Sequence, residues 1–240
     1  MTPPLYAQRI FAFSKRSQAN SFYSGRHYSA LARWLLSPVL STTVDNDDDD
    51  SDFAVLYDLT NRGSEPAISF TNPDHLWNHR SNTSNCTNTN KFLFLRGYPT
   101  PKWMNIIGAK YFVDPEFFLR HLGEVTEPRT PDLAILPSLP SSANIIELYI
   151  TNIGSFNDSS SGSSVQMLRD DCAKSMELHS TQLAKHTGVA TCHPIVRKFS
   201  VHDKRHFSIE QKISIYISGS GGETTGKSLR TILKYSSASD

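Results

Sequence analysis

The strongest chemical motif in the sequence lies near its C-terminal end. Residues 221–228, GGETTGKS, place Gly221, Gly226, Lys227 and Ser228 at the spacing G-x-x-x-x-G-K-[ST] of a phosphate-binding loop. In such a loop the backbone N–H groups surround the phosphates, the lysine reaches the β and γ phosphates, and the serine ligates Mg²⁺. The motif predicts nucleotide binding only where a strand precedes it and a helix follows it.

The surroundings of this loop favour a β-hairpin instead. Residues 213–218, ISIYIS, and residues 229–235, LRTILKY, both have strand-like composition, and the second group alternates polar and apolar side chains partly with period two. Only twelve residues follow Ser228, so the other strands of a P-loop sheet would have to precede the loop, with Asp58 as the Walker B aspartate. We therefore predict a hairpin and keep the four motif residues as an alternative nucleotide site.

A second group of side chains combines metal-ligand and catalytic types. It consists of His202, Asp203, His206 and Glu210, which could ligate a metal from one helix or place a His–Asp pair beside a serine. The segment crosses a junction between a strand and a turn, where no single face collects these side chains. A surface loop is the better interpretation.

A third group could form a zinc site. Its members are Cys172, His179, Cys192 and His193. Structural zinc ligands usually occur in closely spaced pairs, which this group lacks.

The acidic run at residues 45–52 lacks the glycine and the closing glutamate of an EF-hand loop, and such dense like charge stays solvated. We predict no metal ligand, no cofactor and no catalytic residue.

Composition excludes several classes of protein. The 240 residues carry a formal net charge of +1, which gives no electrostatic basis for binding nucleic acid or an anionic membrane. The three cysteines, Cys86, Cys172 and Cys192, form no C-x-x-C pair, and their odd number argues against a disulfide framework. We find no signal peptide and no apolar run of about 20 residues. These features predict a cytoplasmic protein that does not insert into a membrane.

Residues 91–122 contain the densest aromatic content of the chain. Residues 92–95, FLFL, predict a strand that is apolar on both faces, as in the middle of a sheet covered by helices. Thr100 with Pro101, and then Asp114 with Pro115, are start signals for two short helices. Their spacing resembles a DNA-binding helix-turn-helix, but the acidic residues of the second helix would repel phosphates. A packing unit is the better interpretation, with DNA binding as an alternative.

The remaining periodicities complete the predicted fold. We expect helices over residues 20–36, 74–77 and 165–188, with strands at 53–59, 133–136, 145–153, 195–201, 213–218 and 229–235. Polar low-complexity loops are expected at about residues 40–52, 78–90 and 155–164. Together these elements predict a single soluble α/β (α+β) domain over residues 1–240, built on a mixed central sheet of about six or seven strands flanked by helices.

Three segments resemble one family. Residues 93–122, LFLRGYPTPKWMNIIGAKYFVDPEFFLRHL, are similar to a segment of large filamentous-fungal proteins whose C-terminal part looks like a CorA-type Mg²⁺ transporter. Residues 196–217, VRKFSVHDKRHFSIEQKISIYI, resemble a second segment of these proteins, and residues 23–36, YSGRHYSALARWLL, fit them as well. The resemblance implies a cytoplasmic domain with a mixed sheet and flanking helices, like the soluble N-terminal domain of CorA-type proteins.

The sequence departs from this family in the part that conducts ions. The family's pore rests on C-terminal transmembrane helices and a Gly-Met-Asn motif, and this sequence has neither. No pore or metal residue can therefore be transferred to it. The resemblance implies the soluble half of such a protein, truncated relative to the family, which acts without catalysis in regulation or assembly. Its implied partners are further copies of itself or membrane-embedded homologues.

The hairpin interpretation predicts that nucleotide does not bind through Lys227. Titration of the protein with a fluorescent ATP or GTP analogue and Mg²⁺ should give the same signal for the wild type and for Lys227→Ala, because a hairpin loop has no phosphate cradle. A saturable signal that Lys227→Ala removes would establish the nucleotide site instead.

Overall fold

The computed structural model describes residues 1–20, 26–37, 53–58, 67–79, 91–122, 144–156, 164–185, 195–217 and 230–232. These ranges contain six helices: α1 (Pro3–Asn20), α2 (Arg26–Leu36), α3 (Pro73–Asn78), α4 (Pro101–Tyr111), α5 (Pro115–Leu122) and α6 (Val165–Lys185). They also contain seven strands: β1 (Ala54–Asp58), β2 (Ile68–Phe70), β3 (Lys91–Leu95), β4 (Ile145–Ser155), β5 (Val196–Val201), β6 (His206–Ile217) and β7 (Arg230–Ile232).

The strands form two antiparallel sheets. The first has the order β2-β1-β3, and the second has the order β4-β6-β5, with β7 also paired to β6. The mixed α+β composition is therefore confirmed, whereas the prediction of one mixed central sheet is wrong. β7 lies beside β3, so it brings the second sheet next to the first. Sequence patterns reveal strands but carry little information about which strands pair, because pairing depends on contacts between distant segments.

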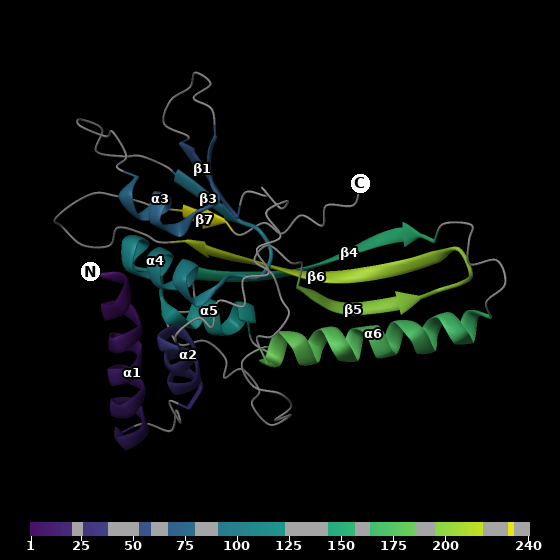
Figure 1. Ribbon diagram of the computed structural model, residues 1–240, viewed down its shortest axis with the longest axis horizontal. Coiled ribbons are helices and arrows are strands. Elements are labelled where there is room, and N and C mark those ends of the chain that lie inside the picture. Colours follow the sequence, from purple (N-terminus) through teal and green to yellow (C-terminus); the bar gives the residue numbers. More distant parts are fainter. Residues whose placement is uncertain are drawn as a thin grey trace.

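Figure 1 shows two parts of different shape. Helices α1 to α5 gather around the first sheet and one end of β6, and the strands β4, β6 and β5 then continue outward as an arm with α6 lying along it. At the end near the helices, Phe117 of α5 packs on Tyr216 of β6 with 5.5 Å between ring centroids. The arm consists of one sheet and one helix, so much of its surface is open to solvent.

The expected strand–helix–helix unit is confirmed in residues 91–122. Thr100 caps α4, since its Oγ1 accepts a hydrogen bond from the Trp103 N–H at 3.5 Å, and Pro101 occupies the first turn. Asp114 Oδ1 accepts from the Glu116 N–H at 2.9 Å at the start of α5. Between the two helices Phe112 adopts a left-handed conformation with φ of 54°. That turn lets both helices direct their apolar faces into the core.

Two details of the predicted strands differ from the structure. In β3 the burial alternates, with Leu93 and Leu95 buried and Phe92 and Phe94 only partly covered, so the strand is not enclosed on both faces. β6 begins at His206, seven residues before the predicted start at residue 213, because this segment pairs with β4 and β5. The predicted strand at residues 133–136 lies outside the described residues, as do residues 40–52 and most of the other two polar loops.

Helix α1 was not expected from the sequence, and it packs against α2 and α4. Its Tyr6 is 4% exposed and donates a hydrogen bond from its hydroxyl to the Val113 carbonyl at 2.9 Å. The same ring lies against Gly108 of α4, where a Cβ atom would come within 2.3 Å of the ring carbons Cε1 and Cζ. The absence of a side chain at Gly108 therefore lets the Tyr6 ring lie close to the α4 backbone.

We predict that Gly108→Ala destabilises the protein. In a helix interior this change normally stabilises by about 1 kcal/mol, but here the new methyl group would overlap a ring held by burial and a hydrogen bond, at a cost of about 1–3 kcal/mol. Chemical denaturation should therefore show a lower free energy of unfolding for Gly108→Ala.

The matched control is the same change in a Tyr6→Leu background. Removing the ring should abolish the penalty, so the two substitutions should be strongly non-additive. If Gly108→Ala leaves stability unchanged or raises it in the wild-type background, the contact with Tyr6 does not constrain this position.

Candidate functional site

The P-loop residues Gly221, Gly226, Lys227 and Ser228 lie outside the described part of the chain. The strands on either side of them are described. β7 runs antiparallel to β6, with Ile215 opposite Ile232 and Ile217 opposite Arg230. The predicted strand at residues 229–235 is thus confirmed for its three described residues. A phosphate-binding loop would require a helix at this position.

The group around His202 lies at the hairpin turn between β5 and β6. Asp203 accepts hydrogen bonds from the N–H groups of Arg205 and His206, at 2.7 and 2.8 Å, and its Oδ2 lies 2.9 Å from His206 Nδ1. These contacts, the His206 side chain first, lower the pKa of the exposed Asp203 carboxyl to about 2. They close the turn in the way expected of a surface loop.

The same turn contains a histidine–serine pair, since His202 Nε2 lies 2.9 Å from Ser208 Oγ. The histidine that contacts a serine is His202, whereas the one that contacts Asp203 is His206. A relay of serine, histidine and aspartate would need one histidine to make both contacts. The turn therefore brings the expected residue types together without the geometry of a triad.

The zinc hypothesis is only partly within the described chain. Cys172 and His179 lie on α6, seven residues apart, whereas Cys192 and His193 fall outside the described ranges. Within those ranges, no group of three or more histidine, cysteine or acidic side chains could hold a metal ion.

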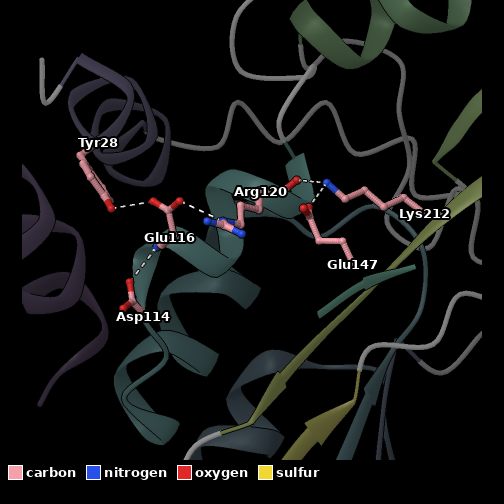
Figure 2. Close-up of polar contacts among 6 residues, drawn as sticks. All are labelled: Tyr28, Asp114, Glu116, Arg120, Glu147 and Lys212. Atoms are coloured by element: carbon pink, nitrogen blue, oxygen red, sulfur yellow. Dashed lines mark hydrogen bonds and ion pairs between the residues drawn. The ribbon is translucent and has the colours of Figure 1, made fainter. Parts of the chain in front are cut away.

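Charged side chains cluster around α5 (Figure 2). Glu116 is 5% exposed, and its two carboxylate oxygens accept from the Tyr28 hydroxyl at 2.7 Å and from Arg120 Nε at 3.0 Å. Lys212 of β6 donates to the Arg120 carbonyl and forms an ion pair with Glu147 of β4. Every charge in this cluster is paired, which offsets the cost of burying Glu116 and of partly burying the others. The cluster ties α2 and α5 to β4 and β6.

A buried serine and histidine meet beside this cluster. His121 Nδ1 of α5 lies 2.9 Å from Ser214 Oγ of β6, and the two residues are 5% and 0% exposed. Burial, with Lys212 as a second cause, lowers the pKa of His121 to about 3, so its ring is neutral near pH 7. The distance would suit a nucleophile and its base, but no substrate can reach a fully buried hydroxyl. The pair is a contact within the core.

The sequence pattern does not reveal the partner of His121. Ser214 lies 93 residues further along the chain. Nothing in the local pattern around Ser214 distinguishes it from a surface serine. Only the packing of α5 on β6 reveals the pair.

The position of α5 also bears on the helix-turn-helix alternative. α5 packs between α2 and β6, and five of its eight residues are buried. A recognition helix must present its side chains to the major groove of DNA. In this structure most side chains of α5 are buried in the core instead.

The most prominent surface feature is strand β4. All eleven of its residues pair with β6 on one side, and no strand among the described residues pairs with its other side. Large apolar side chains are exposed along it: Ile146 42%, Leu148 45%, Tyr149 49%, Ile150 41% and Ile153 77%. We call this unpaired side of β4, with these five side chains, the β4 edge. Unpaired strand edges of this kind recruit further strands.

The sequence predicted the strand but not its exposure. Residues 145–153 are apolar at both even and odd positions, which is typical of a strand buried on both faces. In the structure α6 lies along β5, and α5 lies near one end of β4. Most of β4 therefore remains uncovered.

Comparisons with protein-family models, with curated proteins and with solved structures found no match for this chain. The resemblance to CorA-like proteins stays an expectation from the sequence. In the described ranges, no helix combines the length and apolar character needed to cross a membrane.

We predict a pH dependence of stability from His121. Its folded pKa of about 3 lies below the usual value of 6.5, so as the pH falls below 6.5 the unfolded chain takes up a proton and the folded one does not. The contribution of the neutral, buried His121 to the free energy of unfolding is complete above pH 6.5. It is lost as the pH falls towards about 3, by up to about 1.4 kcal/mol per pH unit.

His121→Asn, which keeps a polar group near Ser214, should flatten the decline of unfolding free energy with falling pH. The exposed His75, changed in the same way, serves as the control and should leave the slope as in the wild type. Equal slopes for all three proteins in denaturant titrations would contradict a buried neutral His121.

Proposed function

We propose that this chain is a non-enzymatic assembly domain of the cytoplasm, related to the soluble region of CorA-like proteins. The observation that carries the proposal is the β4 edge, which pairs with no other strand of the described residues and bears five large exposed apolar side chains. Exposed apolar surface of this extent on a strand edge is characteristic of sites where another protein binds.

The placement of polar residues supports an assembly role over catalysis. Glu116, Arg120 and Lys212 are engaged with one another or with backbone groups, and they hold the helices to the second sheet. The histidines of the β5–β6 turn are engaged in the turn itself. The first group builds the scaffold from which the arm projects, and the second closes the turn at the far end of the arm.

The sequence resemblance supplies the kind of partner. CorA-type proteins that contain transmembrane helices would carry a domain like this one, so membrane-embedded homologues are the partners we propose. The net charge of +1 fits recognition by backbone pairing and apolar contact, since it provides little long-range attraction or repulsion. The alternative of a nucleotide-binding protein rests on the motif at residues 221–228 and is decided by the Lys227 titration.

Co-purification tests this function. The chain, carrying an affinity tag, should be co-expressed with a longer homologue that contains the membrane part, and the complex should be extracted in mild detergent. We expect the homologue to co-elute with the wild-type chain and to be lost with Ile150→Lys, because a lysine at the β4 edge opposes apolar docking.

Leu178→Lys is the matched control, since Leu178 is 60% exposed on α6, away from the edge. It should retain the homologue. A chain that captures no homologue, and that behaves as a strict monomer alone, would refute the assembly role.

A further inference from the structure

The two edges of the second sheet are built differently. The β5 edge is short, at six residues, contains a register shift between Val196 and Lys198, and bears the basic residues Arg197 and Lys198. Short length, irregularity and lysine are the devices by which natural proteins prevent a strand edge from pairing with another chain. The β5 edge is therefore protected.

The β4 edge has none of these devices. It pairs with β6 in an unbroken register over eleven residues, and it contains no proline, lysine or arginine. Its single charged side chain, Glu147, is 19% exposed and is paired with Lys212. A strand of this length presents about 36 Å of regular backbone. This difference between the β5 edge and the β4 edge indicates that the β4 edge is suited to pairing with another strand.

We propose that β4 pairs antiparallel with β4 of a second copy of this chain, about a two-fold axis perpendicular to the sheet at Tyr149. The proposal rests on the assembly function above and names the occupant of the β4 edge. Such an axis joins like faces of the two sheets, so residues opposite each other must both be even-numbered or both odd-numbered. One continuous sheet results, with the strand order β5-β6-β4-β4-β6-β5 and with β7 still paired to each β6.

The axis at Tyr149 matches side chains best. On one face Leu148 stands opposite Ile150 of the second copy, and this apolar row continues onto Ile213 of β6, which is paired with Leu148. On the other face the two Tyr149 rings meet. Aromatic and branched apolar pairs of this kind are the ones that stabilise neighbouring antiparallel strands.

Charge also permits this register. Glu147 would stand opposite Thr151 of the second copy, so no two like charges face each other across the axis. On the same face, Arg197 lies over the Tyr149 ring at 4.5 Å and forms an ion pair with Glu210 at 3.4 Å. The ring is thereby already held in place before a second copy arrives.

The size of the contact sets its strength. Nine residues of each strand, 145–153, would pair. The area that they bury is smaller than the roughly 800 Å² per partner of a standard interface. We therefore expect a reversible dimer with a dissociation constant on the order of micromolar.

Analytical ultracentrifugation of the chain alone tests the dimer. The wild type should pass from monomer to dimer between about 1 and about 100 μM, the range in which a micromolar contact assembles. Leu148→Lys and Ile150→Lys should remain monomeric throughout, because each introduces two buried lysines near the axis. Leu178→Lys should dimerise like the wild type. Circular dichroism checks that all variants are folded, which is expected because each altered side chain is exposed.

Disulfide cross-linking tests the register. With the three native cysteines replaced by serine, Tyr149→Cys should form a covalent dimer under mild oxidation, since position 149 meets itself at the axis. Ile153→Cys is the control. It is more exposed in the monomer, but its two copies would lie about 26 Å apart in this register. Cross-linking at position 153 in place of 149 would overturn the proposed pairing.

The results of these experiments distinguish failure of the β4 dimer from failure of the assembly function. A wild-type monomer at every concentration refutes the β4 dimer. If that monomer still captures a membrane-embedded homologue, and loses it with Ile150→Lys, then the β4 edge takes a strand from another protein and the assembly function stands. A dimer that survives both lysine substitutions also refutes the proposal, because its contact lies elsewhere.

Discussion

Helix α5 is buried from two sides at once, and the arrangement of the other elements depends on this. On one side Phe117 packs on Tyr216 of β6, and on another Glu116 accepts a hydrogen bond from the hydroxyl of Tyr28 in α2. A carboxylate removed from water is tolerated only with charged or hydrogen-bonding partners, because unpaired burial costs several kcal/mol. Arg120, one turn along α5, supplies the charge. One short helix thus joins the helical layer to the second sheet.

The arm follows from the limited reach of this helix. α5 covers the end of β6 that holds Ser214 and Tyr216, while β6 continues for several residues beyond it. α6 supports that extension from the side of β5, where Arg169 donates from Nε to the Val201 carbonyl at 3.2 Å. No described helix covers the middle of β4, so apolar side chains that could serve a core face solvent. The same packing that stabilises one end of the sheet leaves its other edge available for binding.

Predictions from local sequence held where the signal lay within a few residues. Thr100 with Pro101 started a helix as expected. The prediction of a single sheet failed because pairing partners such as Ile145 and Tyr216 are far apart in the chain. Helix α1 was not predicted because the burial of its residues, Tyr6 among them, depends on contact with α4, which lies far away in the sequence.

The sequence by itself determined most helices and strands, the N-cap of α4, and the absence of a strong charge for attracting nucleic acid or membranes. These are properties of neighbouring residues, set by backbone sterics, capping and net charge. Tertiary structure decided that His121 meets Ser214 in the core and that β4 lies at an uncovered edge. An apolar strand has the same sequence pattern whether it is buried or exposed. Only the packing of distant elements decides which surfaces water reaches, and so where another protein can bind.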